Sequence, residues 1–478
     1  MKNTRIKLQL IACLLIIASL AGCAGGTARD GGGEAGVSDG NSGAVQHDGA
    51  EGDNDNGNGT GERNVNEGSG AISVVAVNAG ELLEPRYGEK NSTAATIARG
   101  ANEFAFRLSA ALAAENGTGN FICSPFSVWL PLAALVNATN NQYKASLLEA
   151  LSAAGVSEDD INSAASRMLY DLTQQRTREY ESELQPYYDP LKIVNAVFVS
   201  TGVTFKRDFA QTFMDCYRGS AINVDFGSDE AASAVNQWAS DNTEGLITDI
   251  IQEFDPQTVA VMANAIYFSD RWSWEFDPEQ TVEDVFYSPD GESEAFYMLR
   301  EGDNLVYYED ARVQAITLWF KTGGSMCIIL PKDNDATGLL TSMTNAYFRE
   351  IKNDAIFATG KLLLPRFSFE SGVMQLDDAL KLLGVPLFDE KAAPLTGGLI
   401  EEDVPVWLSG ALQKAVIEVD EKGTTAAAVT IMPAAGAGMP IPTEPFEMNC
   451  NRPFVFVLCS RTYDGGEQVL FTGAVNKP

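Results

Sequence analysis

The sequence predicts an α+β domain with large β-sheets. Helical and strand patterns alternate along the chain without the regular order of βαβ units. Hydrophobic residues make up 45% of the 478 residues, which is enough for a sizeable packed core. The globular pattern begins near residue 94 and continues to residue 478 without an internal repeat. We therefore expect one folded domain over residues 94–478, preceded by segments of another kind.

Residues 1–22 have the pattern of an export signal. Basic residues precede an apolar run over residues 8–20 that is too short for a comfortable membrane span. The run ends in Leu-Ala-Gly followed by Cys23, which resembles a bacterial lipobox. That resemblance implies cleavage before Cys23 and a diacyl anchor on it, and two acyl chains suffice for stable membrane attachment. The alternative is an ordinary signal peptide with a chance cysteine.

Residues 23–93 are expected to form a flexible acidic tether. Gly, Asn, Asp, Ser and Glu dominate, and residues 71–77 are a short apolar exception. Such a composition cannot bury enough apolar surface to offset the entropy lost on ordering. The tether would hold the folded domain away from the membrane.

The charge and the rare residue types exclude several functions. The net charge is -32 and the pI is about 4.3, so the surface repels nucleic acid. The only histidine, His47, lies in the tether, which excludes a Ser-His-Asp or Cys-His centre and a histidine-ligated metal from the domain. No cofactor and no metal are expected.

The cysteines of the domain are expected to be buried thiols. Five of the seven cysteines follow the tether, are widely spaced and form no C-x-x-C pair: Cys123, Cys216, Cys327, Cys450 and Cys459. Neither a disulfide framework nor a zinc site fits this odd number and spacing.

Helices are predicted where apolar residues recur at helical spacing. The first covers residues 97–112, the next begins at Pro125 and another begins at Ser146. A longer helix over residues 231–251 is expected to break at Gly245. The last ends at Gly384.

Strands are predicted where β-branched and aromatic residues alternate or form short apolar runs. Residues 259–268 are a nearly continuous apolar run, which is typical of a fully buried strand. The other predicted strands are residues 120–124, 193–199, 313–320, 325–330, 361–369, 415–419, 453–460 and 469–475.

The segment after the strand at residues 415–419 is the most informative. A run of small residues follows it, ahead of a Pro/Gly-rich loop over residues 433–442. Taken alone, the run is also compatible with an Ala-rich helix or a plain loop. The run resembles the hinge of an inhibitory serpin, and its residues are Glu421, Lys422, Gly423, Thr424, Thr425, Ala426, Ala427 and Ala428.

The serpin resemblance implies a mechanism. In that family a protease cuts an exposed reactive-centre loop, which inserts as a new central strand of the main sheet and carries the protease along as an acyl-enzyme. Gly423 would let the backbone pivot at the start of the loop. Alternate residues share one face of a strand, so Thr424, Ala426 and Ala428 would face the core with little bulk.

Further motifs carry the same resemblance over residues 95–478. Asn120 to Ser127 is similar to the family's Asn-x-x-x-Ser-Pro-x-Ser segment, and residues 236–245 resemble the helix that lies across the main sheet. The family pattern implies that Ser124, Ser127 and Asn264 hold the sheet shut at its middle, that Trp272 lies near the point of loop entry, and that Arg366 pairs with Glu421. The implied fold has a large central, mostly antiparallel sheet, two smaller sheets and about nine helices.

Two residues depart from the family pattern. Gln413 stands where the family usually has a histidine in the middle of the sheet, and glutamine still donates and accepts hydrogen bonds. Pro433 lacks the N–H that a central strand requires, so it argues against insertion that far.

The cleavage bond is expected between Ala437 and Gly438. Counting the family distance forward from Glu421 leads to Ala437, whereas counting back from Asn451 leads to Pro442, a poor cleavage residue. Ala435 and Met439 are further alternatives. A small residue at the cut suits elastase-like or subtilisin-like serine proteases, and a papain-like cysteine protease remains open.

The leading hypothesis is therefore a monomeric, exported and lipid-anchored inhibitor that faces the extracellular side of a bacterial cell and is not an enzyme. Its partners would be extracellular or host serine proteases, held as covalent acyl-enzyme complexes, and the membrane, with no nucleic acid. A non-inhibitory serpin-like surface binding protein is the second hypothesis. A lipid-anchored enzyme or solute-binding protein is the third, and the missing histidine argues against it.

Overall fold

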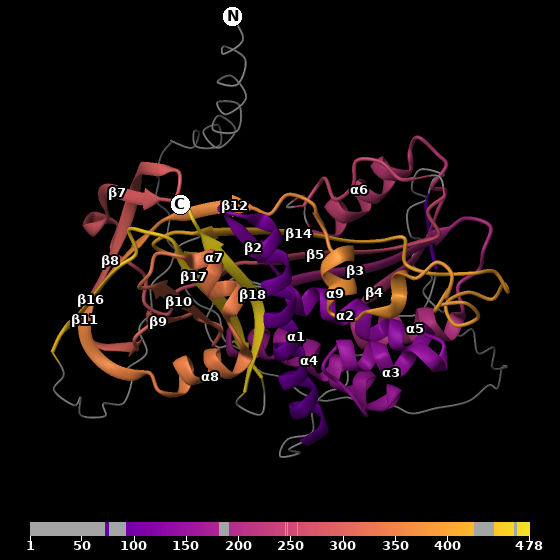
Figure 1. Ribbon diagram of the computed structural model, residues 1–478, viewed down its shortest axis with the longest axis horizontal. Helices are drawn as coiled ribbons and strands as arrows, with labels where there is room; N and C mark the ends of the chain where they lie inside the picture. The colour runs from indigo at the N-terminus through magenta and orange to yellow at the C-terminus, as the bar shows by residue number, and fades with distance from the viewer. Residues whose placement is uncertain are drawn as a thin grey trace, which may run out of the picture. The chain divides into compact units, whose positions relative to one another are not determined.

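Two large β-sheets and one two-stranded sheet build the folded part of the chain, in a computed structural model (Figure 1). The structure describes residues 72–75, 92–180, 191–243, 245, 247–255, 257–424, 444–462 and 466–478. Within these residues there are nine α-helices. The predicted α+β class, with a large central sheet and smaller ones, is confirmed.

The nine helices differ in how deeply they are buried. Every residue of α2 is buried, because its sequence is apolar on all sides. Pro125 opens it at a position where a missing N–H costs nothing. The helices are α1 (Ser92–Asn116), α2 (Pro125–Leu135), α3 (Asn141–Ala150), α4 (Glu158–Tyr180), α5 (Arg207–Tyr217), α6 (Ala231–Asn242), α7 (Ala336–Ser342), α8 (Asn345–Asn353) and α9 (Asp377–Leu382).

The first sheet is mixed and has the order β1-β4-β3-β5-β14-β12, with β13 also paired to β14. Its β3–β4 and β5–β14 pairs are parallel, and its β1–β4, β3–β5 and β12–β14 pairs are antiparallel. The strands are β1 (Ile72–Val74), β3 (Leu191–Ser200), β4 (Gly219–Val224), β5 (Ala260–Phe268), β12 (Phe367–Glu370), β13 (Met374–Gln375) and β14 (Gly410–Val419).

The second sheet has nine strands in the order β16-β11-β8-β9-β10-β17-β18-β2, with β7 paired to β8. They are β2 (Phe121–Cys123), β7 (Val282–Ser288), β8 (Gly291–Glu309), β9 (Val313–Trp319), β10 (Ser325–Pro331), β11 (Ile356–Pro365), β16 (Phe446–Asn449), β17 (Phe454–Arg461) and β18 (Glu467–Val475). The small sheet pairs β15 (Gly423–Thr424) with β6 (Asp270–Arg271).

Two hydrophobic clusters cover the faces of the first sheet. The larger cluster joins it to α1, α2, α4 and the second sheet. The smaller cluster contains Val235 and Trp238 of α6, and the Trp238 ring packs edge-on against Phe198 of β3 at 5.5 Å between ring centroids. Helix α6 therefore covers this face of the first sheet, and Figure 1 shows it beside the sheet.

Several elements differ from the sequence prediction. The expected strand 361–369 is two strands, because the chain leaves the second sheet after Pro365 and enters the first at Phe367. The expected helix 231–251 ends at Asn242, and Gly245 takes a left-handed φ of 78°. The pattern did not predict the helices α4, α5, α7 and α8 or the strands β4, β7 and β8.

The expected tether contains one strand. Ile72–Val74 pair antiparallel with Ile222–Val224 at the edge of the first sheet, and Val75 donates its N–H to Ala221 at 2.9 Å. Ile72 and Val74 pack against the smaller cluster, whereas Ser73 is exposed. β1 therefore covers the outer edge of β4, with its apolar side chains toward the cluster and its polar side chain toward solvent.

Within the described residues, no helix combines the length and the apolar character that a membrane span requires.

Candidate functional site

The β5–β14 pair is a seam in the first sheet. Gly410–Ala415 pair in parallel with Val261–Ile266. On their other sides, β5 and β14 each have an antiparallel neighbour, β3 and β12. An antiparallel strand laid between β5 and β14 would pair with both, and parallel pairing is slightly weaker per residue than antiparallel pairing. Inside this sheet, the seam is thus the place where an inserted strand would replace one parallel pair by two antiparallel pairs.

A buried polar cluster holds the seam from the side of α2. The Gln413 side chain donates to the Ser124 carbonyl at 2.8 Å, to Ser127 Oγ at 3.0 Å and to Asn264 Oδ1 at 3.1 Å. It also accepts the Ser124 N–H at 2.9 Å. Ser127 donates to Asn264 as well. The predicted serines, asparagine and glutamine therefore meet in one network that spans both strands of the seam.

The cluster includes a residue that the sequence analysis missed. Asn195 on β3 accepts a hydrogen bond from Asn264 Nδ2 at 2.7 Å and lies directly across from it in the sheet. Its own Nδ2 is buried and has no partner among the described residues. Asn195, Asn264 and Gln413 form a row of amides across three strands. The available signal was a lone amide in the middle of an otherwise apolar strand.

Trp272 supports the chain where it leaves the seam. Its indole is buried and stacks on Phe320 at 4.4 Å between ring centroids. Its Nε1 donates to the Asp420 carbonyl and its backbone N–H to the Lys422 carbonyl, both at 2.9 Å. The indole therefore fixes the turn between β14 and β15.

The carboxylate of Glu421 is held by two side chains. Arg366 Nε and Nη2 donate to the same carboxylate oxygen at 2.8 and 2.5 Å, and Thr281 Oγ1 donates to it at 2.5 Å. Burial alone would raise the pKa of Glu421, but the hydrogen bonds from Arg366 and Thr281 outweigh it and hold the pKa below its usual value. The pairing of Arg366 with Glu421 matches the expectation from the sequence.

Gly423 allows the backbone to approach β6 closely. It pairs with Arg271 and takes a φ of 149°. A Cβ at this position would lie 2.1 Å from the Asp270 carbonyl oxygen, so no other residue fits without a shift. Thr424 pairs with Asp270, accepts the Asp270 N–H on its Oγ1 at 2.8 Å and is buried. The first residues of the expected hinge are thus paired at the end of the seam.

Several predicted residues lie outside the described residues. They are Cys23, Thr425, Ala426, Ala427, Ala428, Pro433, Ala437 and Gly438.

The thiols in the described part of the chain carry no reactive site. Of these cysteines, four are buried and Cys216 is partly exposed, and none is in a disulfide. Burial raises the pKa of Cys123 and Cys327 to about 11 and that of Cys450 to about 12, so these thiols stay protonated. The described residues contain no group of three or more side chains able to hold a metal.

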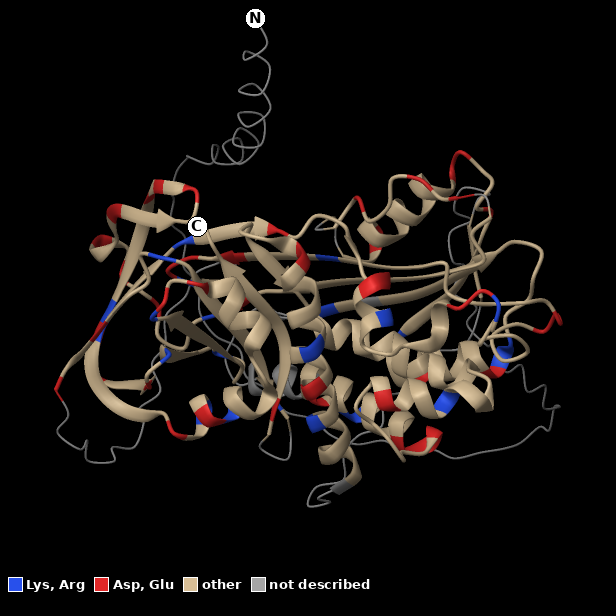
Figure 2. Cartoon of the chain, viewed as in Figure 1, with Lys and Arg blue, Asp and Glu red and all other residues tan. Residues whose placement is uncertain are grey.

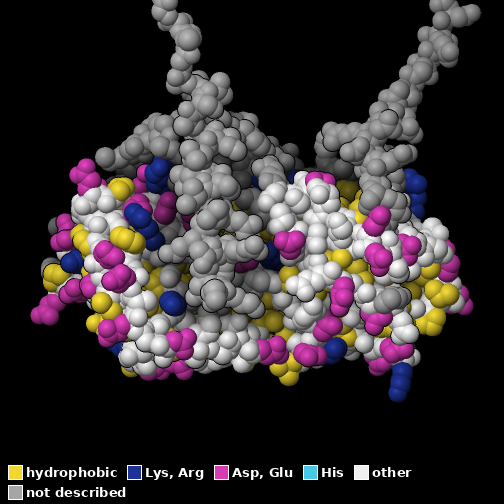
Figure 3. All heavy atoms as spheres, turned by 90° about the horizontal axis from the view of Figure 1, so that it is seen from above, with side chains coloured by type: hydrophobic (Ala, Val, Ile, Leu, Met, Phe, Trp, Pro, Cys, Tyr) yellow, Lys and Arg dark blue, Asp and Glu magenta, His cyan; other side chains and the backbone are white. Residues whose placement is uncertain are grey.

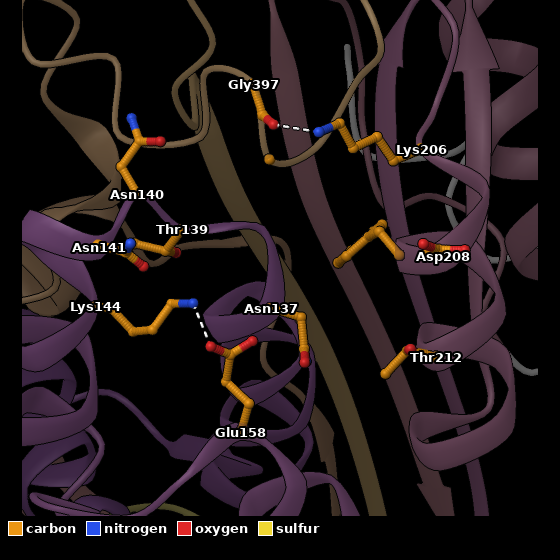
Figure 4. A pocket seen from close by; sticks show the side chains of 12 residues that line it. Asn137, Thr139, Asn140, Asn141, Lys144, Glu158, Lys206, Asp208, Thr212 and Gly397 are labelled. Carbon is orange, nitrogen blue, oxygen red and sulfur yellow. Dashed lines mark hydrogen bonds and ion pairs between the residues drawn. The ribbon is translucent and has the colours of Figure 1, made fainter.

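A polar pocket of about 430 Å³ lies away from the seam, among α3, α4, α5 and the loop at Gly397 (Figure 4). Its two lysines already have partners in the protein. Lys144 is paired with Glu158, and Lys206 donates to the Gly397 carbonyl at 2.5 Å (Figure 4). None of the seam or hinge residues described above lines this pocket, so we assign the candidate site to the seam and the hinge.

Sequence and structure comparisons relate this chain to known proteins. The family model described as serpin (serine protease inhibitor) matches residues 99–478. Antitrypsin of Bombyx mori is 30% identical over 372 residues, which cover 76% of this chain and 90% of that protein. Alpha-1-antitrypsin of Meriones unguiculatus is 29% identical over 381 residues, 79% of this chain and 89% of that protein. The native state of the thermophilic serpin tengpin has a similar fold, with a TM-score of 0.68, 24% identity and coverage of 84% and 98% of the two chains.

Proposed function

Because this chain belongs to the serpin family, we propose that it is a suicide-substrate inhibitor of serine-type endopeptidases and not an enzyme. The observation that carries the proposal is the parallel β5–β14 seam with the hinge strand β15 paired antiparallel at its end. A cut loop that continued from β15 would enter between two strands that both accept an antiparallel neighbour.

The register of β15 predicts the contacts of the inserted loop. Gly423 pairs with Arg271 and Thr424 with Asp270. Continued without a slip, this register would bring Thr430 beside Asn264. Insertion would draw Asn264 and Gln413 apart, and the Thr430 hydroxyl would enter between them as a new polar partner. A buried amide left without a partner costs about 1–3 kcal/mol, so this replacement favours the inserted state.

The same register predicts which loop residues face α6. Ala263 and Ala265 of β5 lie in the cluster under α6. Ile431 and Val429 would lie beside them, so larger loop residues would meet small sheet residues on that face. Insertion would then add these side chains to the cluster that also contains α6 residues.

Pro433 would interrupt the ladder only at its far end. The Lys422 carbonyl accepts the Trp272 N–H, so the backbone groups of Lys422 point toward the β5 side of the seam. Successive residues of a strand point their backbone groups to opposite sides. In the inserted loop, even-numbered residues would therefore pair with β5 and odd-numbered residues with β14. Pro433 is odd-numbered and would turn its nitrogen toward β14, beside Gly410, the first residue of that strand. The proline therefore costs at most one hydrogen bond, which is a smaller obstacle to insertion than the sequence alone suggested.

The energetics support a nearly irreversible change. About ten new ladder bonds at roughly 1 kcal/mol each would contribute on the order of 10 kcal/mol. We infer that an elastase-like or subtilisin-like protease cuts between Ala437 and Gly438 and is carried with the loop as an acyl-enzyme.

We further propose that the protein is a monomer displayed on the outside of a bacterial membrane through diacylated Cys23. The arrangement of β1 supports this orientation. A line across the sheet from β1 leads to the beginning of β5. Ile72 of β1 pairs with Val224 of β4, and Val224 pairs with Ser200 of β3. Ser200 in turn donates its N–H to the carbonyl of Val259, the residue before β5. The anchored segment thus joins the sheet at the end remote from the hinge, which would leave the loop facing away from the membrane.

The test is to mix the full chain, purified in detergent, with pancreatic elastase and with subtilisin. Denaturing gels and mass spectrometry should show a covalent complex and a released peptide that begins at Gly438. Cleavage without a complex and without a rise in thermal stability would disprove insertion and leave a binding role. Cleavage with a rise in stability but no complex would mean that deacylation outpaces insertion, and Pro433→Ala should then restore the complex.

A further inference from the structure

The β7–β8 hairpin presents an acidic and aromatic outer face. Its cross-strand pairs on this face are Glu283 with Phe296, Val285 with Glu294, and Tyr287 with Glu292. Tyr287 and Phe296 are each 51% exposed, and the three glutamates are exposed as well. On the opposite face Phe286 and Tyr297 are buried, whereas Val282 and Asp284 are exposed. These outer positions carry no basic residue (Figure 2).

Both ends of the loop meet this hairpin. On the hinge side, Thr281, which precedes β7, holds the Glu421 carboxylate, and Arg366 donates its N–H to the Phe296 carbonyl at 2.8 Å. On the return side, Tyr287 donates its N–H to the Asn451 carbonyl at 2.8 Å. A protease that engages the segment between Glu421 and Asn451 must therefore come close to the hairpin.

We propose that the outer face of the β7–β8 hairpin is a docking surface for the target protease. This surface would select proteases that carry basic residues beside the active site. This inference rests on the proposed inhibitory function. Exposed aromatic side chains with charged neighbours are suited to the centre and rim of a transient interface. The three glutamates outnumber the one basic group near the rings, Arg366, whose guanidinium lies over Phe296 and is paired with Glu421. In Figure 3, acidic and hydrophobic side chains lie next to one another at the end of the molecule that carries β7 and β8.

The expected effect is on the rate of encounter. Complementary charge speeds association and makes it sensitive to salt, whereas it changes the chemistry at the cut bond little. Neutralising the three glutamates with Glu283→Gln, Glu292→Gln and Glu294→Gln should slow complex formation with a basic protease by about tenfold at low salt and flatten its salt dependence.

The test uses the full chain, a subtilisin variant with lysines placed beside its active site, and unmodified subtilisin. The rate constant of complex formation is measured for wild type, the triple hairpin variant and a matched triple of exposed acids between α9 and β14, Glu390→Gln, Glu401→Gln and Asp403→Asn. Only the hairpin triple should be slowed, and only with the lysine-bearing protease. Equal slowing by both triples would mean a general charge effect and would overturn the proposal.

The aromatic residues are tested separately. Tyr287→Ala should slow complex formation about threefold to tenfold. Phe357→Ala, which removes a ring that is even more exposed, at 62%, from β11, should leave the rate unchanged. Tyr287 is the better probe than Phe296, because the Arg366 guanidinium lies 5.7 Å from the Phe296 ring and also holds Glu421.

Docking is measured without the covalent step by using the lysine-bearing subtilisin with its catalytic serine replaced by alanine. Surface plasmon resonance should show weaker binding to the hairpin triple than to wild type or the control triple. Equal binding to all three would refute the docking surface. If the active proteases form no complex but the inactive one still discriminates, the inhibitory function fails and the docking surface stands.

Discussion

Arg366 and Glu421 form an ion pair whose two sides differ in exposure: the Arg366 side chain is 45% exposed, whereas the Glu421 side chain is 7% exposed. The cation remains solvated while the carboxylate depends on its protein partners. Arg366 lies between β11 of the second sheet and β12 of the first, so the pair ties the hinge to the point where the chain changes sheets.

Arg366→Gln should destabilise the resting form by about 1 kcal/mol, since it removes one partner of a carboxylate that is largely buried. The pKa of Glu421 is lowered in the folded state. Its contribution is therefore present above the unfolded pKa and is lost as the pH falls through the folded pKa. Thermal midpoints at pH 7 and pH 3 measure this: the difference between the variant and wild type should be smaller at pH 3 than at pH 7. An equal difference at both pH values would contradict the ion-pair account.

Gln413→His should make the seam sensitive to pH. The wild-type cluster of serine, asparagine and glutamine side chains contains no group that titrates between pH 5 and 8. A buried histidine is disfavoured when charged, so the unfolded chain binds more protons and stability falls as the pH drops below about 6.5. The thermal midpoint of the variant should fall between pH 8 and pH 5. Gln252→His, at an exposed position, should show no such fall beyond that of wild type.

Gly423→Ala should displace the hinge from β6, because its Cβ would meet the Asp270 carbonyl oxygen at 2.1 Å. We expect a loss of about 1–3 kcal/mol and faster proteolytic nicking after Lys422 by trypsin. Gly410→Ala is the control, since a Cβ at that position would have no atom within 4 Å and its φ is not in the left-handed region. Identical nicking rates for the two variants would refute a hinge held by close approach.

Asn195→Leu should weaken the amide row. It removes the acceptor that Asn264 Nδ2 uses at 2.7 Å, and the loss of this hydrogen bond should cost about 1 kcal/mol. The thermal midpoint of the uncut form should fall more than that of the cut form, because only the uncut form relies on the row to close the seam. A larger loss in the cut form would reverse the assignment.

Ile72→Asp with Val74→Asp should detach β1. Both side chains pack against the cluster under α6, and burying a charge there is costly. We expect a lower thermal midpoint and faster amide exchange at Val75. Ser73→Asp adds a charge on the exposed side of the same strand and should change the free energy of unfolding by less than about 0.5 kcal/mol. Should the two variants behave alike, β1 would have no stabilising role.

Much of the candidate site was predictable because its residues occur in short, ordered motifs. The Ser-Pro-Phe-Ser segment and the buried strand at residues 259–268 resemble serpin motifs, and that resemblance implied the roles of Ser124, Ser127 and Asn264. The small residues after Glu421 pointed to a hinge. These signals are local, since residue size, turn chemistry and strand pattern can be read within a few positions.

Asn195 and Thr281 were not predictable in this way. Their roles depend on register and on approach between strands: Asn195 matters because it lies across from Asn264, and Thr281 because it reaches Glu421 from a residue 140 positions away in the chain. A lone amide in an apolar strand can mark a buried polar contact, but neither it nor a lone hydroxyl shows which residue is the partner.

The sequence by itself determined the α+β class, the buried strand β5 and the hinge composition, and its resemblance to the serpin pattern implied Arg366 as the partner of Glu421. Only the tertiary structure decided that β5 and β14 are parallel neighbours, that residues 361–369 divide between two sheets, and that Ile72–Val74 close a sheet edge. The physical reason is that helix and strand preference are set by neighbours along the chain, whereas strand order and register are set by the packing of side chains that the sequence holds far apart.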